Sequence, residues 1–323
     1  MTHSAPGIDA IRAARATLGD AIIRTPVVRC AGLEDRLGNA CRVYGKLEFL
    51  QRTGTFKARG ALVTLNGLTP DQRAAGVTAV SAGNHAIATA FAAQMTGTHA
   101  KVVMIASANP WRLEAARRYG AEVVVAGDAH EAFERAEQIQ QQEGRYFVHP
   151  FEGPTVALGT GTLGLEICEQ VPEFDQVIIP IGGGGLIAGA SNAIRQLRPQ
   201  STIIGVEPEG ADTMHRSFES GQPEAVDKVR TIADSLGAPY SLPYSFELTR
   251  ANVDQLVQVT DDALRAAMRE LFSLMKLAVE PACAAATAAL LGPLREAAAG
   301  RTVVIVFCGS NIDWATWEAL SEP

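Results

Sequence analysis

Short apolar segments that alternate with helical patterns constrain the fold of this chain most strongly. The segments VIIPI (177–181) and VVIVF (303–307) contain no polar side chain. A strand that is apolar at every position is buried on both faces, which is typical of parallel sheets covered by helices on each side. Helical patterns of about 10 to 15 residues separate the predicted strands, as in βαβ units. The pattern therefore predicts an α/β fold with parallel sheets and helices on both faces.

The predicted elements form two series along the chain. In the first series the strands are Val77–Ser81, Lys101–Ile105 and Glu122–Ala126, and the helices are Asn84–Met95, Pro110–Tyr119 and Ala129–Glu143. In the second series the strands are Gln176–Ile181, Thr202–Val206 and Thr302–Phe307, with one helix ending near Leu197 and another at Ile312–Leu320. A long irregular stretch, Thr231–Arg250, is expected near the active site, because loops of this length are commonly functional.

Composition and charge exclude several classes of protein. The 35 acidic and 28 basic residues leave a net charge of −7, which argues against a nucleic-acid partner. No run approaches the roughly 20 apolar residues that span a bilayer, and residues 1–9 do not resemble a signal peptide. The five cysteines are scattered without a CxxC pair, so neither a disulfide framework nor a metal site is expected from them. We expect a cytoplasmic protein without a membrane partner.

A run of four glycines, Gly182, Gly183, Gly184 and Gly185, directly follows a predicted strand and opens the next helix. Without Cβ atoms the backbone can approach an anion closely, and the helix N-terminus adds a partial positive charge. The run lacks the dinucleotide pattern G-x-G-x-x-G and the Lys-Ser or Lys-Thr of a P-loop. We interpret it as a cradle for a single phosphate, with a plain strand-to-helix crossover as the alternative.

Two further motifs carry polar chemistry. The turn S-A-G-N-H (81–85) also joins a strand to a helix, and its N–H groups suit a carboxylate or a ring oxygen. Serine and asparagine are also ordinary helix caps, so this signal is moderate on its own. Lys57 lies in T-G-T-F-K (53–57), between small residues and helix formers. A desolvated lysine has a lowered pKa and can act as a nucleophile or base, whereas a lone lysine is usually a solvated surface charge.

Taken together with C-G-S-N (308–311), these motifs resemble the fold type II pyridoxal-phosphate enzymes. The resemblance is strongest to the serine/threonine dehydratase (ammonia-lyase) and serine racemase branch, and it extends from about Thr25 to Asn311. It implies a tryptophan synthase β-like fold with a large cofactor-binding domain, residues 1–69 plus 147–323, and a small mobile domain, residues 70–146. It also implies pyridoxal 5′-phosphate as cofactor, an amino acid as small-molecule substrate and a homodimer.

The resemblance assigns a role to individual residues around the cofactor. Lys57 would form a Schiff base with the cofactor and later remove the Cα proton of the substrate. Phe56 would pack beside the pyridine ring, Asn84 would bind the 3-oxygen, and Cys308 would face the ring nitrogen. Glu280 would lie near the ring. The phosphate would be held by Gly182, Gly183, Gly184 and Gly185, and the substrate carboxylate by Ser81, Ala82, Gly83, Asn84 and His85.

Two of these positions favour elimination over other reactions. A neutral Cys308 cannot stabilise a protonated pyridine ring, so the ring is a weaker electron sink and loss of a β-substituent is favoured. Racemase relatives carry a serine where this chain has Ala82, which has no proton to donate. We therefore expect a dehydratase that converts a β-hydroxy amino acid (L-threonine, L-serine or a bulkier analogue such as L-phenylserine) to a 2-oxo acid and ammonia. The alternatives are a hydroxyaspartate ammonia-lyase, a serine racemase-like enzyme or a non-catalytic phosphate-binding regulator.

Some positions depart from the family pattern. Ile87 and Thr160 replace amides common in relatives, so they are expected to alter the pocket for the substrate side chain. Relatives with a divalent cation use a Glu, a backbone carbonyl and an Asp. Glu207 and Ala211 match the first two of these ligands, but Thr213 occupies the third position. Because a hard cation requires several oxygen ligands, Glu207 and Ala211 are weak candidates and no metal is expected.

Overall fold

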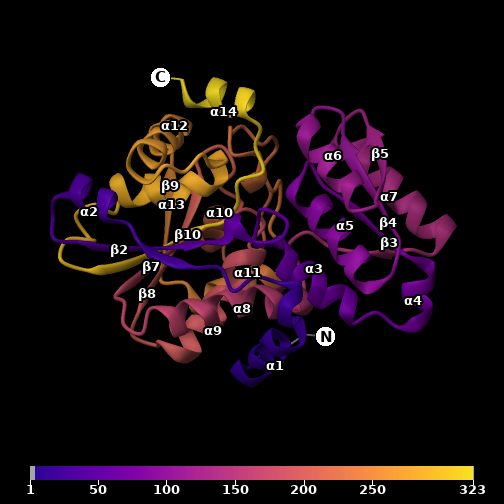
Figure 1. Ribbon diagram of the computed structural model, residues 1–323, viewed down its shortest axis with the longest axis horizontal. Helices are drawn as coiled ribbons and strands as arrows, with labels where there is room; N and C mark the ends of the chain where they lie inside the picture. Colours follow the sequence, from indigo (N-terminus) through magenta and orange to yellow (C-terminus); the bar gives the residue numbers. More distant parts are fainter. Residues whose placement is uncertain (1–3, 323) are drawn as a thin grey trace.

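The computed structural model describes residues 4–322 and contains two separate β-sheets (Figure 1). The larger sheet has the strand order β1-β2-β10-β7-β8-β9, and the smaller has the order β5-β4-β3-β6. The strands are β1 Val27–Arg29, β2 Arg42–Leu47, β3 Val77–Val80, β4 Ala100–Ile105, β5 Glu122–Ala126, β6 Tyr146–Phe147, β7 Gln176–Pro180, β8 Thr202–Pro208, β9 Gln255–Val259 and β10 Thr302–Phe307. The pairing of β1 with β2 is antiparallel, and the other strand pairs of both sheets are parallel. The predicted α/β fold is confirmed.

Helices connect these strands and cover the sheets (Figure 1). The α-helices are α1 Ile8–Leu18, α2 Ala31–Leu37, α3 Lys57–Asn66, α4 Pro70–Ala75, α5 Asn84–Thr96, α6 Pro110–Arg118, α7 Ala129–Glu143, α8 Pro154–Gln170, α9 Gly185–Leu197, α10 Thr213–Ser220, α11 Pro243–Asn252, α12 Asp261–Glu270, α13 Pro281–Leu291 and α14 Trp314–Ser321. Short helical turns are η1 Gly19–Ala21, η2 Glu48–Leu50, η3 Asp234–Leu236 and η4 Leu271–Met275, the last being a π-helix.

Most predicted elements agree with the structure to within about two residues. The apolar run of β10 is fully buried between β2 and β7, which explains why it needs no polar face. The predicted irregular stretch Thr231–Arg250 is wrong in its second half, because α11 begins at Pro243. Proline at the first helical position loses no hydrogen bond, and the prediction overlooked this start signal.

Helix α3 lies between the two sheets. Its apolar residues Ala58, Leu62 and Leu65 share a core with Ile87 and Phe91 of α5, which covers the small sheet. On another side, α3 packs against α8. The four-stranded sheet with its helices forms the right-hand part of Figure 1. Helix α3 packs between this part and the rest of the molecule. The division into domains at residues 70 and 146 stays a prediction.

A buried cluster of charged side chains fixes the start of α3. The Arg59 guanidinium donates to both carboxylate oxygens of Glu48, at 2.8 and 2.9 Å, and to both of Glu166, at 2.9 and 2.8 Å. The Lys46 ammonium donates to Glu166 at 2.7 Å. All four residues are completely buried. Although burial alone would raise it, the two cations lower the pKa of Glu166 to about 2, so the cluster stays ionised.

Replacing Arg59 by Met should destabilise the protein by about 3–5 kcal/mol, because Glu48 and Glu166 would keep buried charges without a full complement of cations. The free energy of unfolding in urea measures this loss. Arg12→Met is the control, since Arg12 pairs only with Asp9 at the surface and should change stability by about 0–1 kcal/mol. Equal effects of the two substitutions would contradict the importance assigned to the cluster.

Candidate active site

The carboxyl ends of the parallel strands of the large sheet bring the predicted residues together. Gly182 follows β7, Cys308 follows β10, and the loop that carries Lys57 follows β2. Because these strands run parallel, their ends meet at one edge, where ligands bind in open α/β sheets. The backbone N–H of Phe56 donates to the Cys308 carbonyl at 3.2 Å, which ties the lysine loop to the end of β10.

The Lys57 side chain is partly buried at the first turn of α3. Its ammonium donates to the Pro150 carbonyl at 2.7 Å and lies 5.3 Å from the centre of the Phe56 ring. Burial lowers the pKa of Lys57 from 10.5 to about 8, and Cys308 and Glu280 oppose this shift only in part. An amine with this pKa has a much larger neutral fraction near physiological pH than an ordinary lysine, and the neutral form can act as nucleophile or base.

Lys57 lies between two narrow spaces. The first has a volume of about 30 Å³, close to that of one water molecule in the liquid. Its walls include the predicted residues Phe56, Lys57, Asn84, Gly182, Gly183, Gly184, Gly185, Glu280 and Cys308, and in addition Phe151, Pro180, Leu186, Ser235, Leu236 and Ala282. The second, about 10 Å³, is bordered by His85, His149, Val156 and Thr160 among others. The structure therefore gathers all nine predicted cofactor residues around one space.

The four glycines are required by close packing. A Cβ atom on Gly183 would lie 2.3 Å from the Phe151 ring, and one on Gly185 would lie 2.6 Å from the Phe151 carbonyl oxygen. Gly184 has φ +90°, a conformation that other residues rarely adopt. The 13-residue helix α9 begins at Gly185, and the N–H groups of its first turn have no acceptor within the helix. These donors form a cradle suited to a phosphate.

The turn at residues 81–85 lies at the N-terminus of α5. The Gly83 N–H donates to the Ser81 hydroxyl at 3.0 Å, and His85 Nε2 is 2.8 Å from the Val148 carbonyl oxygen. Burial, followed by the nearby Lys57, lowers the pKa of His85 to about 3, so this imidazole is neutral. Asn84 and His85 border the spaces beside Lys57, whereas Ser81, Ala82 and Gly83 are not among the residues lining them.

Asn84 and Glu280 are held by a buried amide and carboxylate network. Asn84 Nδ2 donates to Glu280 Oε1 at 2.8 Å, and Asn311 Nδ2 donates to Asn84 Oδ1 at 2.8 Å. Burial raises the pKa of Glu280, while Arg112 acts against this shift. Ser235 lies in the irregular stretch 231–250 expected near the active site, and it does line the space beside Lys57. No role for Asn311 or Arg112 follows from the sequence. Asn311 stood in a recognised motif, but no spacing pattern distinguishes Arg112 from surface residues.

The Cys308 thiol is buried beside the cavity. A hydrogen bond with Cys283, together with burial, raises the pKa of Cys308 well above its ordinary value. The thiol is therefore neutral at physiological pH. A neutral Cys308 is the condition under which we expect elimination rather than transamination.

Ile87 and Thr160 line two different cavities. Ile87 lines a separate cavity of about 410 Å³ that Trp111 and Tyr119 also border, so it does not face Lys57. Thr160 borders the second space beside Lys57, and its hydroxyl donates to the Gly185 carbonyl at 2.8 Å. Of the two positions, Thr160 is the one that can influence a group bound near Lys57.

Glu207, one of the two weak metal candidates, has a structural role. The Glu207 carboxylate accepts the backbone N–H groups of Met214 and His215 at 2.9 and 2.7 Å and so caps α10. Burial raises its pKa to about 8. Ala211 lies on the same loop, and the buried Thr213 hydroxyl has no hydrogen-bond partner in the structure. Within residues 4–322, no group of three His, Cys, Asp or Glu side chains is arranged to hold a metal ion.

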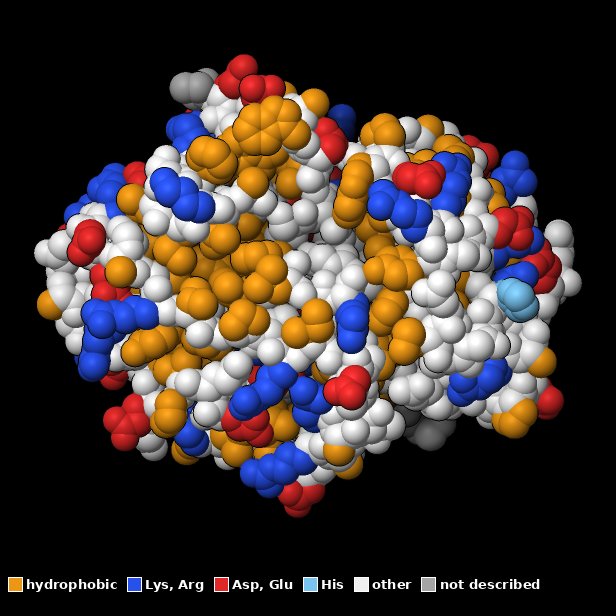
Figure 2. Space-filling view, viewed as in Figure 1, with side chains coloured by type: hydrophobic (Ala, Val, Ile, Leu, Met, Phe, Trp, Pro, Cys, Tyr) orange, Lys and Arg blue, Asp and Glu red, His pale blue; other side chains and the backbone are white. Residues whose placement is uncertain are grey.

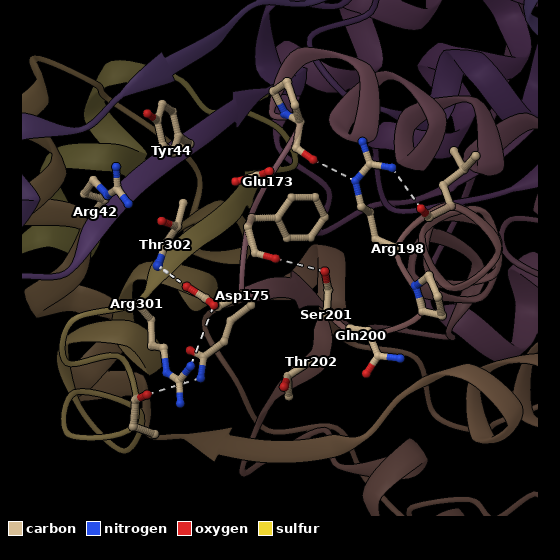
Figure 3. Close-up of a pocket in the computed structure, with 16 residues that line it drawn as sticks. Arg42, Tyr44, Glu173, Asp175, Arg198, Gln200, Ser201, Thr202, Arg301 and Thr302 are labelled. Carbon is tan, nitrogen blue, oxygen red and sulfur yellow. Dashed lines mark hydrogen bonds and ion pairs between the residues drawn. The ribbon is translucent and has the colours of Figure 1, made fainter.

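A larger cavity, about 640 Å³, lies at the opposite edge of the large sheet, where β7, β8 and β10 begin (Figure 3). Its most buried cation, Arg198, donates to the carbonyl oxygens of Pro172 and Cys168. None of the residues predicted for catalysis lines this cavity. Its size alone does not make it the active site, because the chemistry lies around Lys57.

Comparison with known proteins agrees with this geometry. Residues 18–309 match the model of the pyridoxal-phosphate dependent enzyme family. The chain is 54% identical to phenylserine dehydratase of Ralstonia pickettii, covering 98% of this chain and 96% of that protein. It is 38% identical to L-threonine ammonia-lyase of Thermotoga maritima, covering 95% and 76%. Among solved structures, maize serine racemase superposes with a TM-score of 0.92 at 32% identity, covering 98% and 97%.

The chain therefore belongs to the pyridoxal-phosphate dependent enzymes. Within that family it lies in the serine/threonine dehydratase and serine racemase branch, as the resemblance of its motifs predicted. Its donor groups fit the cofactor: an amine of lowered pKa, a helix N-terminus without side chains and a buried amide surround one space. Within the described residues, no helix is long and apolar enough to cross a membrane.

The lowered pKa of Lys57 can be measured in the cofactor-free protein. Because only the neutral amine is acylated, labelling of Lys57 by acetic anhydride should rise with pH and reach half its maximum near pH 8. Lys101 is the internal control, since a hydrogen bond from its ammonium to Glu143 raises its pKa. Mass spectrometry of the labelled peptides gives both curves. Labelling of Lys57 that follows or lags behind Lys101 would contradict the desolvated site.

Proposed function

We propose that this chain is a pyridoxal-phosphate dependent dehydratase that acts on β-hydroxy amino acids, with L-phenylserine as a preferred substrate. The observation that carries the proposal is the 54% identity to a phenylserine dehydratase over nearly the whole length of both proteins. The arrangement around Lys57 supports it, because Lys57, the four glycines, Asn84 and His85 border two adjoining spaces. The products are a 2-oxo acid and ammonia.

Lys57 is the proposed base. When bound, pyridoxal phosphate supplies an electron sink for the pair of electrons that remains at Cα after its proton leaves. The Lys57 amine accepts that proton at Nζ, and its pKa of about 8 makes both the amine and the ammonium available at neutral pH. To do so it must leave the Pro150 carbonyl, its present acceptor. The N-terminus of α5 holds the substrate carboxylate, because the first-turn N–H groups attract an anion.

The neighbouring residues favour elimination. With the cofactor bound, the neutral Cys308 thiol would place no charge beside its ring, so the cofactor would be a weaker electron sink and loss of the β-hydroxyl would be favoured. Ala82, at the position where racemase relatives carry a serine, has no proton to give, which disfavours racemisation. His85 stays neutral and retains its bond to Val148, so it is a positioning group in this scheme rather than an acid.

The lining of the site also argues against a hydroxyaspartate as the main substrate. A second carboxylate on the substrate calls for a cation, and Lys57 is the only Lys or Arg among the described residues that line the two spaces. Apolar groups such as Phe56, Phe151 and Val156 surround the amine instead. An aromatic side chain is more compatible with these walls than a second negative charge.

Release of 2-oxo acid from L-serine, L-threonine, threo-3-hydroxyaspartate and L-threo-phenylserine tests the proposal. We expect kcat/KM to be highest for L-threo-phenylserine, and Lys57→Ala to lower it by about 10³-fold or more because the base is lost. Lys228→Ala, which removes an exposed lysine, should retain wild-type activity. A preference for threonine would overturn the substrate but leave the reaction intact. Absence of oxo acid from all four would overturn the dehydratase.

We also propose that residues 70–146 move as a unit and that the chain forms a homodimer. The separate four-stranded sheet supports the first proposal. For the second, Figure 2 shows hydrophobic side chains gathered over the part of the molecule that contains the large sheet. Exposed Phe272 and Trp314 add to the apolar surface.

Sedimentation equilibrium tests the homodimer directly. We expect a mass twice the 34.1 kDa of the chain at micromolar concentration. A mass of one chain that does not change with concentration would contradict the dimer.

A further inference from the structure

Arg112 contacts three segments of the large-sheet part although it belongs to α6, beside the small sheet. Only 4% of it is exposed. Its Nε donates to the Asn311 carbonyl at 2.7 Å, and its Nη1 donates to Asp234 Oδ2 at 2.5 Å. Its Nη2 is 3.3 Å from both Asp234 Oδ1 and Glu280 Oε2. A planar guanidinium can serve these acceptors together, whereas an ammonium cannot match the geometry.

These contacts are part of a closed ring of hydrogen bonds. Arg112 bonds Glu280, which accepts from Asn84 Nδ2 at 2.8 Å. Asn84 Nδ2 also donates to the Ser235 hydroxyl at 3.0 Å. Ser235 in turn donates to Asp234 at 3.2 Å, and Asp234 returns to Arg112. We call these five residues the hydrogen-bond ring.

Four of the five connections in the ring join the two parts of the molecule. Asn84 begins α5 and Arg112 lies in α6, both on the small-sheet side, whereas Asp234, Ser235 and Glu280 lie in η3 and before α13. Asn84, Ser235 and Glu280 line the 30 Å³ space beside Lys57. The ring therefore forms part of the wall of this space and connects the two parts of the molecule there.

The turn before α5 is shaped to admit Arg112. A Cβ atom on Gly83 would lie 2.3 Å from Arg112 Cδ, so a larger residue would displace the arginine. Without Arg112, the fully buried Glu280 would have no cation beside it, and its charged form would become costly. Arg112 is therefore fitted to this position by the shape of the turn, and its charge is needed by the buried Glu280.

We propose that Arg112 is a positioning residue that holds the small-sheet part closed over the Lys57 site and thereby fixes Asn84 and Ser235 around the bound substrate. This inference rests on the proposed function, but the closure itself is a property of the protein without substrate. Arg112 acts through Asn84, Ser235 and Glu280 and touches no reacting atom. Its loss should loosen the segments that carry these residues and misplace the reacting groups by a small distance, which is enough to slow an enzyme about 10²-fold.

Two measurements on Arg112→Met test the inference. In the cofactor-free protein, hydrogen–deuterium exchange should become at least about 10-fold faster in peptides covering residues 81–91 and 231–240, and remain unchanged in those covering β7 and β10. In the loaded enzyme, kcat/KM should fall about 10²-fold, with a decrease in kcat as well as a rise in KM. Arg117→Met, on the exposed side of the same helix, should behave like the wild type in both assays.

Asp234→Ala provides a second route if Arg112→Met does not fold. Asp234 is half exposed, and its loss opens the ring while leaving the Arg112–Glu280 pair. The same peptides should exchange faster, and kcat/KM should fall about 10-fold. In a double-mutant cycle, Arg112→Met and Asp234→Ala should be less than additive, because each opens the same ring.

Several results would overturn the inference. Faster exchange throughout the chain would mean that Arg112 has a general structural role. If only the exchange rate or only kcat/KM changes, Arg112 does not link closure of the site to catalysis. Additive effects in the cycle would mean that no ring exists. If the wild type releases no oxo acid from any substrate, the proposed function fails, while the exchange measurement still decides whether Arg112 holds the site closed.

Discussion

The placement of Lys57 depends on the buried cluster of Arg59, Glu48, Glu166 and Lys46. Arg59 lies half a turn beyond the lysine in α3, and its guanidinium joins two carboxylates that come from η2 and α8. Buried charges are tolerated only when they are fully paired, so α3 cannot rotate or slide without breaking several bonds. The cluster therefore determines both the position of the helix and the direction in which Lys57 enters the site.

Burial lowers the pKa of some groups in this site and raises the pKa of others. Desolvation lowers the pKa values of Lys57 and His85, to about 8 and about 3, and it raises the pKa of Glu280. The result is a base that titrates near neutrality beside an imidazole that does not. In the same region the thiol of Cys308 stays protonated. Exclusion of water at the edge of the large sheet, together with the hydrogen bond between Cys283 and Cys308, thus leaves a base that titrates near neutrality beside a neutral thiol.

The two parts of the molecule are connected in different ways on the two sides of the site. On one side, α3 shares an apolar core with the small sheet and packs against α8, and such contacts are insensitive to small rotations. On the other side, the two parts are connected by the hydrogen-bond ring. Its bonds are directional and are lost when the donor and acceptor atoms move apart by a short distance. An apolar joint on one side and a polar connection on the other fit the proposed movement of residues 70–146 as a unit.

The sequence by itself determined the parallel α/β fold and the position of most strands, because apolar strands, glycine runs and helix-start turns are local signals that depend on backbone geometry and burial. Most of the residues around Lys57 were identified through the resemblance of the motifs to a known family. It did not reveal that Ile87 faces a different cavity from Thr160, that α11 replaces half of an irregular stretch, or that Glu207 caps α10. Only the tertiary structure decided the partners of Arg112, since Asp234, Glu280 and Asn311 lie more than a hundred residues away along the chain. Long-range pairing of charges leaves no periodic trace in a sequence, because it depends on how separate elements pack and not on the conformation of any one of them.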